Sequence, residues 1–114
     1  MLKRMLLIVM LTATVLAQSQ HEMNAQAAAD FAKADKELNV VYKQLTARLQ
    51  PLTKEKLITA QLLWVKLRDA DAEARASEWE GGSMYPMIYE ATRARSTRQR
   101  VTELREWLDE LKER

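Results

Sequence analysis

The sequence predicts an all-α protein: an up-down-up bundle of three antiparallel helices that follows a cleaved signal peptide. Three observations support this fold. The chain is rich in Ala, Leu, Glu, Lys, Arg and Gln, which favour helices. Proline or paired glycine interrupts it only near Pro51 and near Gly81–Gly82. Apolar residues recur every seven positions in each resulting stretch, as in helices packed side by side.

The first 17 residues have the pattern of a secretory signal peptide. Lys3 and Arg4 precede an apolar run that extends through Leu16, and the small residue Ala17 is suited to the cleavage position. The run is shorter than the about 20 residues that cross a membrane. We therefore expect residues 1–17 to be removed, leaving residues 18–114 as a single helical domain that is periplasmic or secreted. The alternative is an uncleaved N-terminal anchor.

The composition narrows the classes of function. Lys3 and Arg4 account for two of the 18 basic residues, so the expected mature chain has 16 basic and 16 acidic residues. A net charge near zero removes the main support for nucleic-acid binding, which depends on neutralising phosphates. The chain has no cysteine, so packing alone must hold this exported domain together.

The three helices are expected at residues 21–49, at residues 53–79, and from residue 83 or 86 to residue 112. Thr53 is the expected N-cap of the second helix and Ser83 that of the third, because a side-chain oxygen can accept a bond from a free helical amide. Short connections make consecutive helices antiparallel. A helical hairpin that dimerises is the alternative architecture.

Each predicted helix has an apolar seam. The expected seam residues are Phe31, Ala34, Leu38, Val41 and Leu45 in the first helix; Leu57, Ala60, Trp64, Leu67 and Ala74 in the second; and Met87, Ala94, Val101, Leu104, Leu108 and Leu111 in the third. Trp107 has two interpretations, as part of this core or as an exposed binding residue.

Charged residues lie on or beside these seams. Asp35 falls beside the first seam, Asp71 shares the heptad position of Trp64, and Arg68 flanks it. Because an isolated buried ion is costly, we expect Arg68 to pair with Asp35 or Asp71. The sequence favours a structural polar cluster of Asp35, Arg68 and Asp71 that links helices, and the alternative is a functional polar site.

Two surfaces remain as candidates for partner binding. The first is the turn between the second and third helices, whose candidate residues are Trp79, Gly81, Gly82, Ser83, Met84, Tyr85 and Tyr89. Trp, Tyr and Met are enriched in interface cores, although the same side chains could close the end of the bundle core. The second surface is the basic run Arg93, Arg95, Arg98 and Arg100, for which a solvated face is the favoured interpretation.

No constellation of residues points to catalysis or to a cofactor. The only histidine, His21, lies near the predicted mature N-terminus, and Ser83 is not part of a Gly-x-Ser-x-Gly elbow. A metalloprotease His-Glu-x-x-His motif and a phosphate-binding glycine loop are both missing from the sequence. We therefore expect no enzyme activity, no catalytic residue, no metal and no cofactor.

An ordered set of short motifs is similar to the LprI-like lysozyme-inhibitor domain family. The motifs are Glu22-Met23-Asn24, Ala34-Asp35-Lys36-Glu37-Leu38-Asn39 with Tyr42, Ala60-Gln61-Leu62-Leu63-Trp64, Leu67-Arg68-Asp69-Ala70, Gly81-Gly82-Ser83-Met84 with Tyr89, and Thr97, Arg100 and Leu104. They cover nearly all of the expected mature chain. The chain departs from the family in having no cysteine, with Gln26, Ala72 and Thr92 at three family cysteine positions.

The resemblance implies a periplasmic helical protein, and some members of the family are described as inhibiting lysozyme. The expected function is a non-catalytic protein-interaction module with a protein partner, specifically an inhibitor of a lysozyme-like muramidase. No nucleic-acid partner and no stable membrane insertion after signal cleavage are expected. The alternative function is an envelope stress or structural protein that makes broad, weak contacts and does not inhibit lysozyme.

Overall fold

The computed structural model describes the backbone of residues 2–114 and the side chains of residues 19–114, and this part of the chain is helical apart from short turns at residues 47–50 and 80–84 and the last residue. Its elements are α1 (Leu2–Thr46), α2 (Pro51–Ala76), the short 3-10 helix η1 (Ser77–Trp79) and α3 (Tyr85–Glu113). The predicted all-α class is confirmed. The predicted signal peptide, residues 1–17, lies outside the described side chains.

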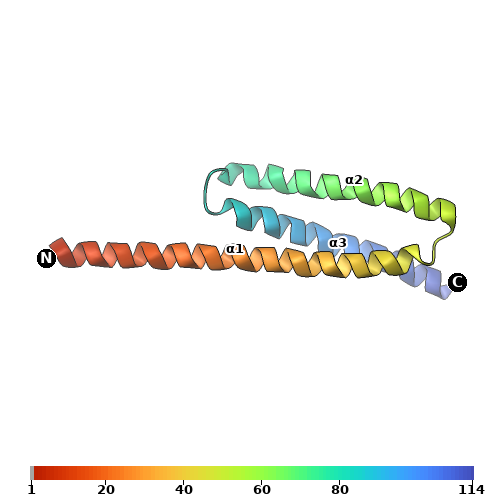
Figure 1. Cartoon of the computed structure of the whole chain (residues 1–114), viewed down its shortest axis with the longest axis horizontal. Helices are drawn as coiled ribbons and strands as arrows, with labels where there is room; N and C mark the ends of the chain where they lie inside the picture. Colours follow the sequence, from red (N-terminus) through yellow and green to blue (C-terminus); the bar gives the residue numbers. More distant parts are fainter. Residues whose placement is uncertain (1) are drawn as a thin grey trace.

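The three long helices run up, down and up, as predicted. Figure 1 shows α2 running opposite to α1 and α3, with α1 extending past the other two helices at its N-terminal end. The molecule is elongated, with a longest dimension of 76 Å. Helix α3 packs along both other helices and approaches α1 most closely. The turn after α2 and the start of α3 therefore lie beside the middle of α1.

The helix ends follow the two predicted breaks, although the expected caps are wrong. Helix α2 begins at Pro51, which lacks an amide hydrogen and suits the first turn, so Thr53 lies inside the helix. Met84, not Ser83, is the N-cap of α3, and its side chain makes no capping bond. Helix α1 begins at Leu2 rather than near residue 21, since no proline or glycine precedes Gln50.

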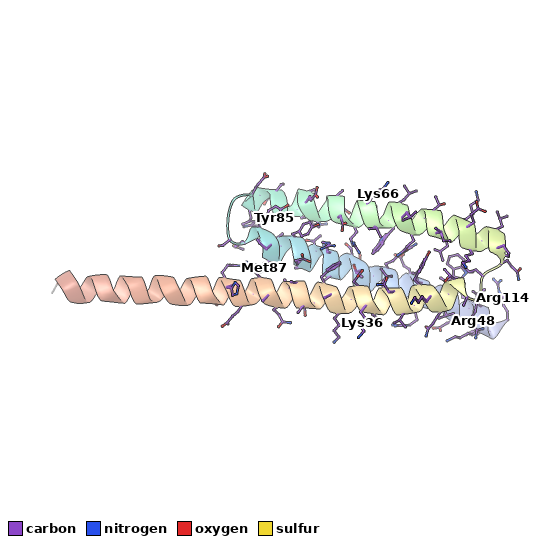
Figure 2. The ribbon with its side chains drawn as sticks, viewed as in Figure 1. Lys36, Arg48, Lys66, Tyr85, Met87 and Arg114 are labelled. Carbon is purple, nitrogen blue, oxygen red and sulfur yellow. The ribbon has the colours of Figure 1, made fainter. Side chains whose placement is uncertain are left out.

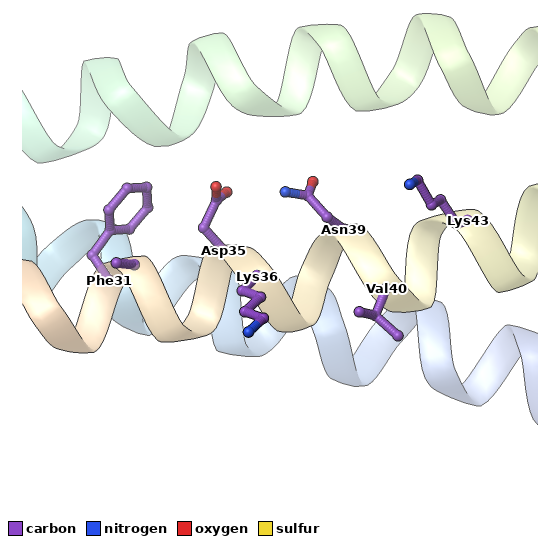
Figure 3. A pocket seen from close by; sticks show the side chains of 7 residues that line it. Phe31, Asp35, Lys36, Asn39, Val40 and Lys43 are labelled. Carbon is purple, nitrogen blue, oxygen red and sulfur yellow. The ribbon is translucent and has the colours of Figure 1, made fainter.

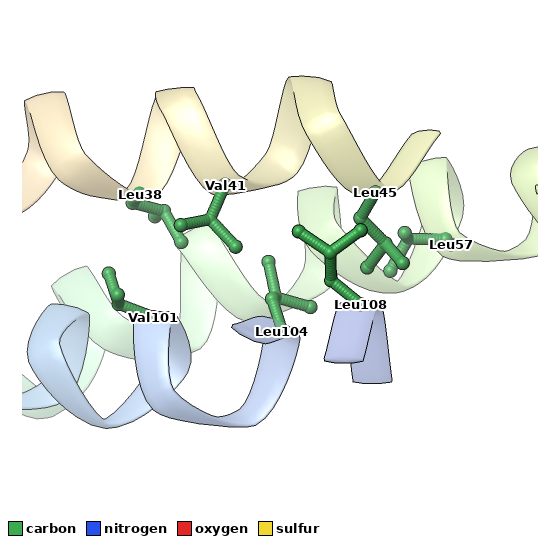
Figure 4. Close-up of a cluster of buried hydrophobic side chains, with 7 residues drawn as sticks. All are labelled: Leu38, Val41, Leu45, Leu57, Val101, Leu104 and Leu108. Atoms are coloured by element: carbon green, nitrogen blue, oxygen red, sulfur yellow. The ribbon is translucent and has the colours of Figure 1, made fainter. Parts of the chain in front are cut away.

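The core lies in the half of the bundle away from the α2–α3 turn. Its buried apolar side chains are Leu38, Val41 and Leu45 of α1, Leu57 of α2, and Val101, Leu104 and Leu108 of α3. Figure 4 shows the side chains of the three helices pointing toward one another. The predicted seams of α1 and α3 are therefore confirmed. Trp64 and Trp107 pack against this core, so Trp107 is a core residue.

The predicted orientation of α2 is only partly right. Leu57 is buried, but Ala60, Leu67 and Ala74 are exposed, with Leu67 60% exposed. A straight helix has 3.6 residues per turn, so a strict seven-residue repeat drifts by about 20° in each heptad. The face that meets the other helices therefore passes from Leu57 to Arg68 and Ala72, and the second predicted row lies outside the bundle.

Candidate functional site

Arg68 is the centre of a polar cluster that joins α2 to α1. Its side chain is 6% exposed, its Nε lies 2.9 Å from Asp69 Oδ1, and its Nη1 lies 3.7 Å from Asp35 Oδ1. Of the two partners that the sequence offered for Arg68, the structure has Asp35 within ion-pair distance. Asp71 is exposed and does not join the cluster, because the drift of the inward face turns it toward solvent. The carboxylate of α2 that pairs with Arg68 is that of Asp69, not that of Asp71.

Asp69 extends the cluster from α2 to α3. Its Oδ1 also accepts a hydrogen bond from Arg93 Nε at 3.1 Å, and Arg93 Nη1 lies 3.3 Å from Glu90 Oε2. Burial raises the pKa of the Asp69 carboxyl, but the bonds and charges of Arg68 and Arg93 outweigh it, so the pKa is lowered from 3.8. One carboxylate thus holds two guanidinium groups from different helices.

The same arginines alternate with flat aromatic rings. The Cζ of Arg93 lies 3.7 Å from the Phe31 ring centre and 5.1 Å from that of Tyr89. The Cζ of Arg68 lies 5.1 Å from the Phe31 ring centre and 5.2 Å from that of Trp64. All four distances are within the about 6 Å at which a cation is attracted to a ring face.

Arg100 continues this row toward the core. Its Cζ lies 5.8 Å from the Trp64 ring centre, and its Nε donates a 3.0 Å hydrogen bond to Gln61 Oε1. We call the whole row the arginine–aromatic ladder. It consists of Tyr89, Arg93, Phe31, Arg68, Trp64 and Arg100. Because its members come from all three helices, the ladder connects α2 to the α1–α3 pair.

Two of the four arginines in the basic run, which the sequence assigned to a solvated face, belong to the ladder. Arg93 and Arg100, seven residues apart, face inward and are 18% and 17% exposed. Arg95 and Arg98 are exposed, so the prediction is right for them alone. With its guanidinium groups already paired to carboxylates and rings, the ladder is a polar cross-link between helices.

The pKa of Asp69 predicts how acid acts on this cross-link. Because the pKa is lower in the folded protein than in the unfolded chain, the carboxylate stabilises the fold fully above pH 3.8, and this stabilisation is lost as the pH falls through the folded pKa. In urea titrations between pH 5 and pH 2, the wild-type protein should lose more stability than Asp69→Asn. Equal losses in the two proteins would contradict the assignment.

The turn between α2 and α3 is held by its own backbone and by α1. Gly82 N donates to Trp79 O at 3.0 Å, and Gly81 has a φ of +79°, a conformation that glycine adopts without steric cost. Asn24 Nδ2 donates a 2.9 Å hydrogen bond to the carbonyl oxygen of Ser83, 59 residues away. The turn is therefore fixed to α1 as well as to its neighbouring helices.

Some side chains of this turn are exposed, and others are half-buried against the rest of the bundle. Trp79 is 36% exposed, and Gly81, Gly82 and Ser83 are exposed. Met84, Tyr85 and Tyr89 are half-buried, and the two tyrosine rings stack with their centres 6.1 Å apart. Figure 2 shows Tyr85 and Met87 where α3 begins, beside the end of α2. Burial raises the pKa of Tyr89, which the neighbouring Arg93 partly opposes.

Two adjoining hollows that the sequence did not predict lie along α1 and together form a groove. One part has a volume of about 420 Å³ and is lined by Phe31, Ala32, Asp35, Lys36, Asn39, Val40 and Lys43. Figure 3 shows Phe31, Asp35 and Asn39 pointing toward α2, whereas Lys36 and Val40 point away. A second part of about 320 Å³ shares Asp35 and Asn39 and reaches Ile58 and Leu62 of α2.

No group of three or more His, Cys, Asp or Glu side chains is placed to hold a metal ion among the side chains described. Within residues 19–114, no helical segment is both long and apolar enough to cross a membrane.

The fold and the site define a small helical bundle that is locked by arginines and ends in an exposed aromatic turn. A sequence model of the family described as lysozyme inhibitor LprI matches residues 12–104. The chain belongs to this LprI family. An uncharacterized protein of Rhizobium meliloti (strain 1021) is 35% identical over 106 residues, an alignment that covers 82% of this chain and 76% of the relative.

A solved structure agrees with the fold. The crystal structure of a DUF1311 family protein from Pseudomonas putida KT2440 superimposes with a TM-score of 0.70 at 24% sequence identity. The match covers 76% of this chain and 91% of that one. Several residues that carry the family resemblance in the sequence meet in the structure: Gln61, Trp64, Arg68 and Arg100 form the ladder and its support, and Asn24 holds the turn.

Besides the groove and the role of Asp69, sequence reasoning missed three contacts of this site. Phe31 was assigned only to the apolar seam, although it receives two guanidinium groups. Arg93 was assigned to the solvated run, although it lies seven residues before Arg100, and that spacing was the available signal of a shared face. The bond from Asn24 to the turn joins distant residues and has no signal in one sequence.

Proposed function

We propose that this chain is an exported, non-catalytic protein-interaction module that inhibits a lysozyme-like muramidase through the aromatic turn, residues 79–85. The observation that carries the proposal is the exposed Trp79 on a turn fixed by the Gly82–Trp79 and Asn24–Ser83 hydrogen bonds. A large side chain held in place before binding loses little conformational freedom on binding. Membership of the LprI family supplies the class of partner.

The charges around the turn support a basic partner. Glu78 and Glu80 are exposed on either side of Trp79. Lysozymes are generally basic, so two carboxylates beside an apolar anchor provide electrostatic complementarity, which raises association rates and specificity. Inhibition of this kind needs no catalytic group on the inhibitor, only a surface that occupies or distorts the enzyme's cleft.

The test is an assay of muramidase activity on cell-wall substrate with increasing amounts of this protein. Trp79→Ala and Tyr85→Ala should each weaken inhibition, Trp79→Ala by about tenfold or more, because anchor residues at interface centres typically contribute at least 2 kcal/mol. Both variants should keep their helical circular dichroism. The matched control is Leu52→Ala, which removes an even more exposed apolar side chain at the other end of the bundle.

Three results would overturn the proposal in different ways. If the wild-type protein does not inhibit the muramidase but binds many envelope proteins weakly, the alternative function, an envelope stress or structural protein with broad contacts, replaces inhibition. If wild-type protein inhibits and the Trp79 variant inhibits equally well, the family function holds but the turn is not the binding surface. Loss of helical signal in both turn variants would assign the aromatic residues to the core.

A further inference from the structure

Helix α2 has a second apolar seam on its outer side. The residues are Ala60, Leu63, Leu67, Ala70 and Ala74, and all five are exposed. Leu63 is 61% and Leu67 is 60% exposed. Their spacing of three, four, three and four residues is that of the a and d positions of a coiled coil. We call this row the outer seam.

The outer seam lies on the side of α2 opposite to the residues that face the bundle. Leu57 and Arg68 are buried toward α1 and α3, and Trp64 packs against the core. Figure 2 shows Lys66, which precedes Leu67, on the side of α2 turned away from α1. Single exposed leucines are ordinary, but an apolar row over four helical turns is typical of a contact surface.

Charges beside the outer seam indicate what covers it. Lys66 and Asp71 flank the seam on opposite sides and are exposed. They are five residues apart, which is the spacing of the g and e positions that form ion pairs between parallel helices of a coiled coil. In a parallel pair of α2 helices, Lys66 of each copy therefore faces Asp71 of the other. In an antiparallel pair centred on the two leucines, Lys66 would instead meet its own counterpart.

The composition of the seam also favours a helix over a lipid surface. Alanines at positions 60, 70 and 74 allow two helix backbones to approach closely. A helix that lies on a membrane instead needs bulky apolar side chains and a polar face rich in Lys and Arg. The polar residues near this seam include Asp71 and Glu73, which an anionic lipid surface would repel.

We propose that two copies of this chain associate in parallel through the outer seams of their α2 helices. Leu63 and Leu67 each meet their counterparts, and two Lys66–Asp71 pairs flank them. This arrangement places both aromatic turns at the same end of the dimer. The surface is separate from the turn, so the association does not depend on the proposed inhibition.

The first test is the molar mass of the purified protein, measured by light scattering at concentrations up to about 0.1 mM, which covers micromolar dissociation constants. We expect the wild-type protein to have twice the monomer mass and Leu67→Glu to be monomeric with unchanged helical signal. The matched control is Leu62→Glu, because Leu62 is 63% exposed on the same helix but lies outside the seam. It should remain dimeric.

Reversal of the flanking charges provides a second test that does not alter the apolar row. Lys66→Asp alone should weaken the dimer about tenfold or more, and Lys66→Asp combined with Asp71→Lys should restore it. A wild-type protein that is monomeric throughout the concentration range overturns the proposal. So does a monomer that sediments with phosphatidylglycerol vesicles, which would assign the seam to lipid.

The orientation can be tested because the chain has no cysteine of its own. Under oxidation, Ala70→Cys should form a disulfide-linked dimer by itself, since the two counterparts meet in a parallel pair. The control is Ala91→Cys, an exposed position on α3 that should stay unlinked. A disulfide that forms only when Ala60→Cys and Ala70→Cys proteins are mixed would show an antiparallel pair and overturn the parallel arrangement.

Discussion

Replacing Trp64 by alanine is expected to lower the free energy of unfolding by about 3 kcal/mol, near the lower end of the range for buried aromatic residues. Trp64 packs against the apolar core and lies between the guanidinium groups of Arg68 and Arg100. The substitution therefore leaves a space beside the core and removes two cation–ring contacts. A small domain has only about 5–15 kcal/mol of stability in total, so the loss should be conspicuous.

Urea unfolding followed by circular dichroism measures this effect. The matched control is Trp79→Ala, because Trp79 is exposed on the turn and contributes little to the core. The free energy of unfolding of this variant should stay within about 0.5 kcal/mol of the wild-type value, as is usual for surface positions. Near-native stability of the Trp64 variant would mean that α2 presents a different face to the bundle.

Replacing Asp69 by alanine is expected to cost about 2 kcal/mol. The substitution removes the shared partner of Arg68 and Arg93, and Arg68 is 6% exposed. Removing one partner of a fully buried ion pair costs about 3–5 kcal/mol, and we expect less here because the Asp69 side chain is 35% exposed and water can reach the site.

Asp71 provides the control for this prediction, two residues further along the same helix. Measured on protein dilute enough to be monomeric, Asp71→Ala should change the free energy of unfolding by less than about 0.5 kcal/mol, since Asp71 is exposed and outside the cluster. In an Arg68→Met background, Asp69→Ala should cost less than in the wild type, because one of the unpaired charges is gone. Equal effects of the two aspartate substitutions would contradict the central role of Asp69.

Much of the fold could be predicted because its signals are local. Pro51 begins a helix and the Gly81–Gly82 pair forms a turn for reasons contained in their own backbones, and both breaks are where the sequence placed them. The seams of α1 and α3 could be read because each helix has one dominant apolar row. Leu38 and Leu104, for example, are both buried as expected.

Helix α2 could not be oriented from the sequence because it has two apolar rows. One row contains Leu57 and Trp64, and the other contains Ala60 and Leu67, each with a seven-residue repeat. Only the first faces the bundle, and the reason is the ladder: Arg68 lies on the same side and meets Phe31 and Asp35 of α1. Such contacts join residues far apart in the chain and have no local pattern.

The partners of Arg68 in the polar cluster could also be predicted only in part. Arg68 could be expected to find a carboxylate, because a buried guanidinium without one is costly. Asp69 and Asp71 lie about 200° apart around α2, so the choice between them depends on how the helix is rotated, and that rotation is set by packing with the other helices. The turn between α2 and α3 could be located from its two glycines. Its hydrogen bond to Asn24 of α1 could not be predicted from the sequence.

The most direct test of the proposed function is amide hydrogen exchange of this chain with and without a lysozyme-like muramidase. If the aromatic turn is the binding surface, added protection should be confined to residues 77–89, around Trp79 and Tyr85, with exchange in the groove beside Asp35 and Asn39 unchanged. Protection confined to the groove or to the outer seam of α2, or exchange unchanged everywhere at saturating enzyme, would contradict it.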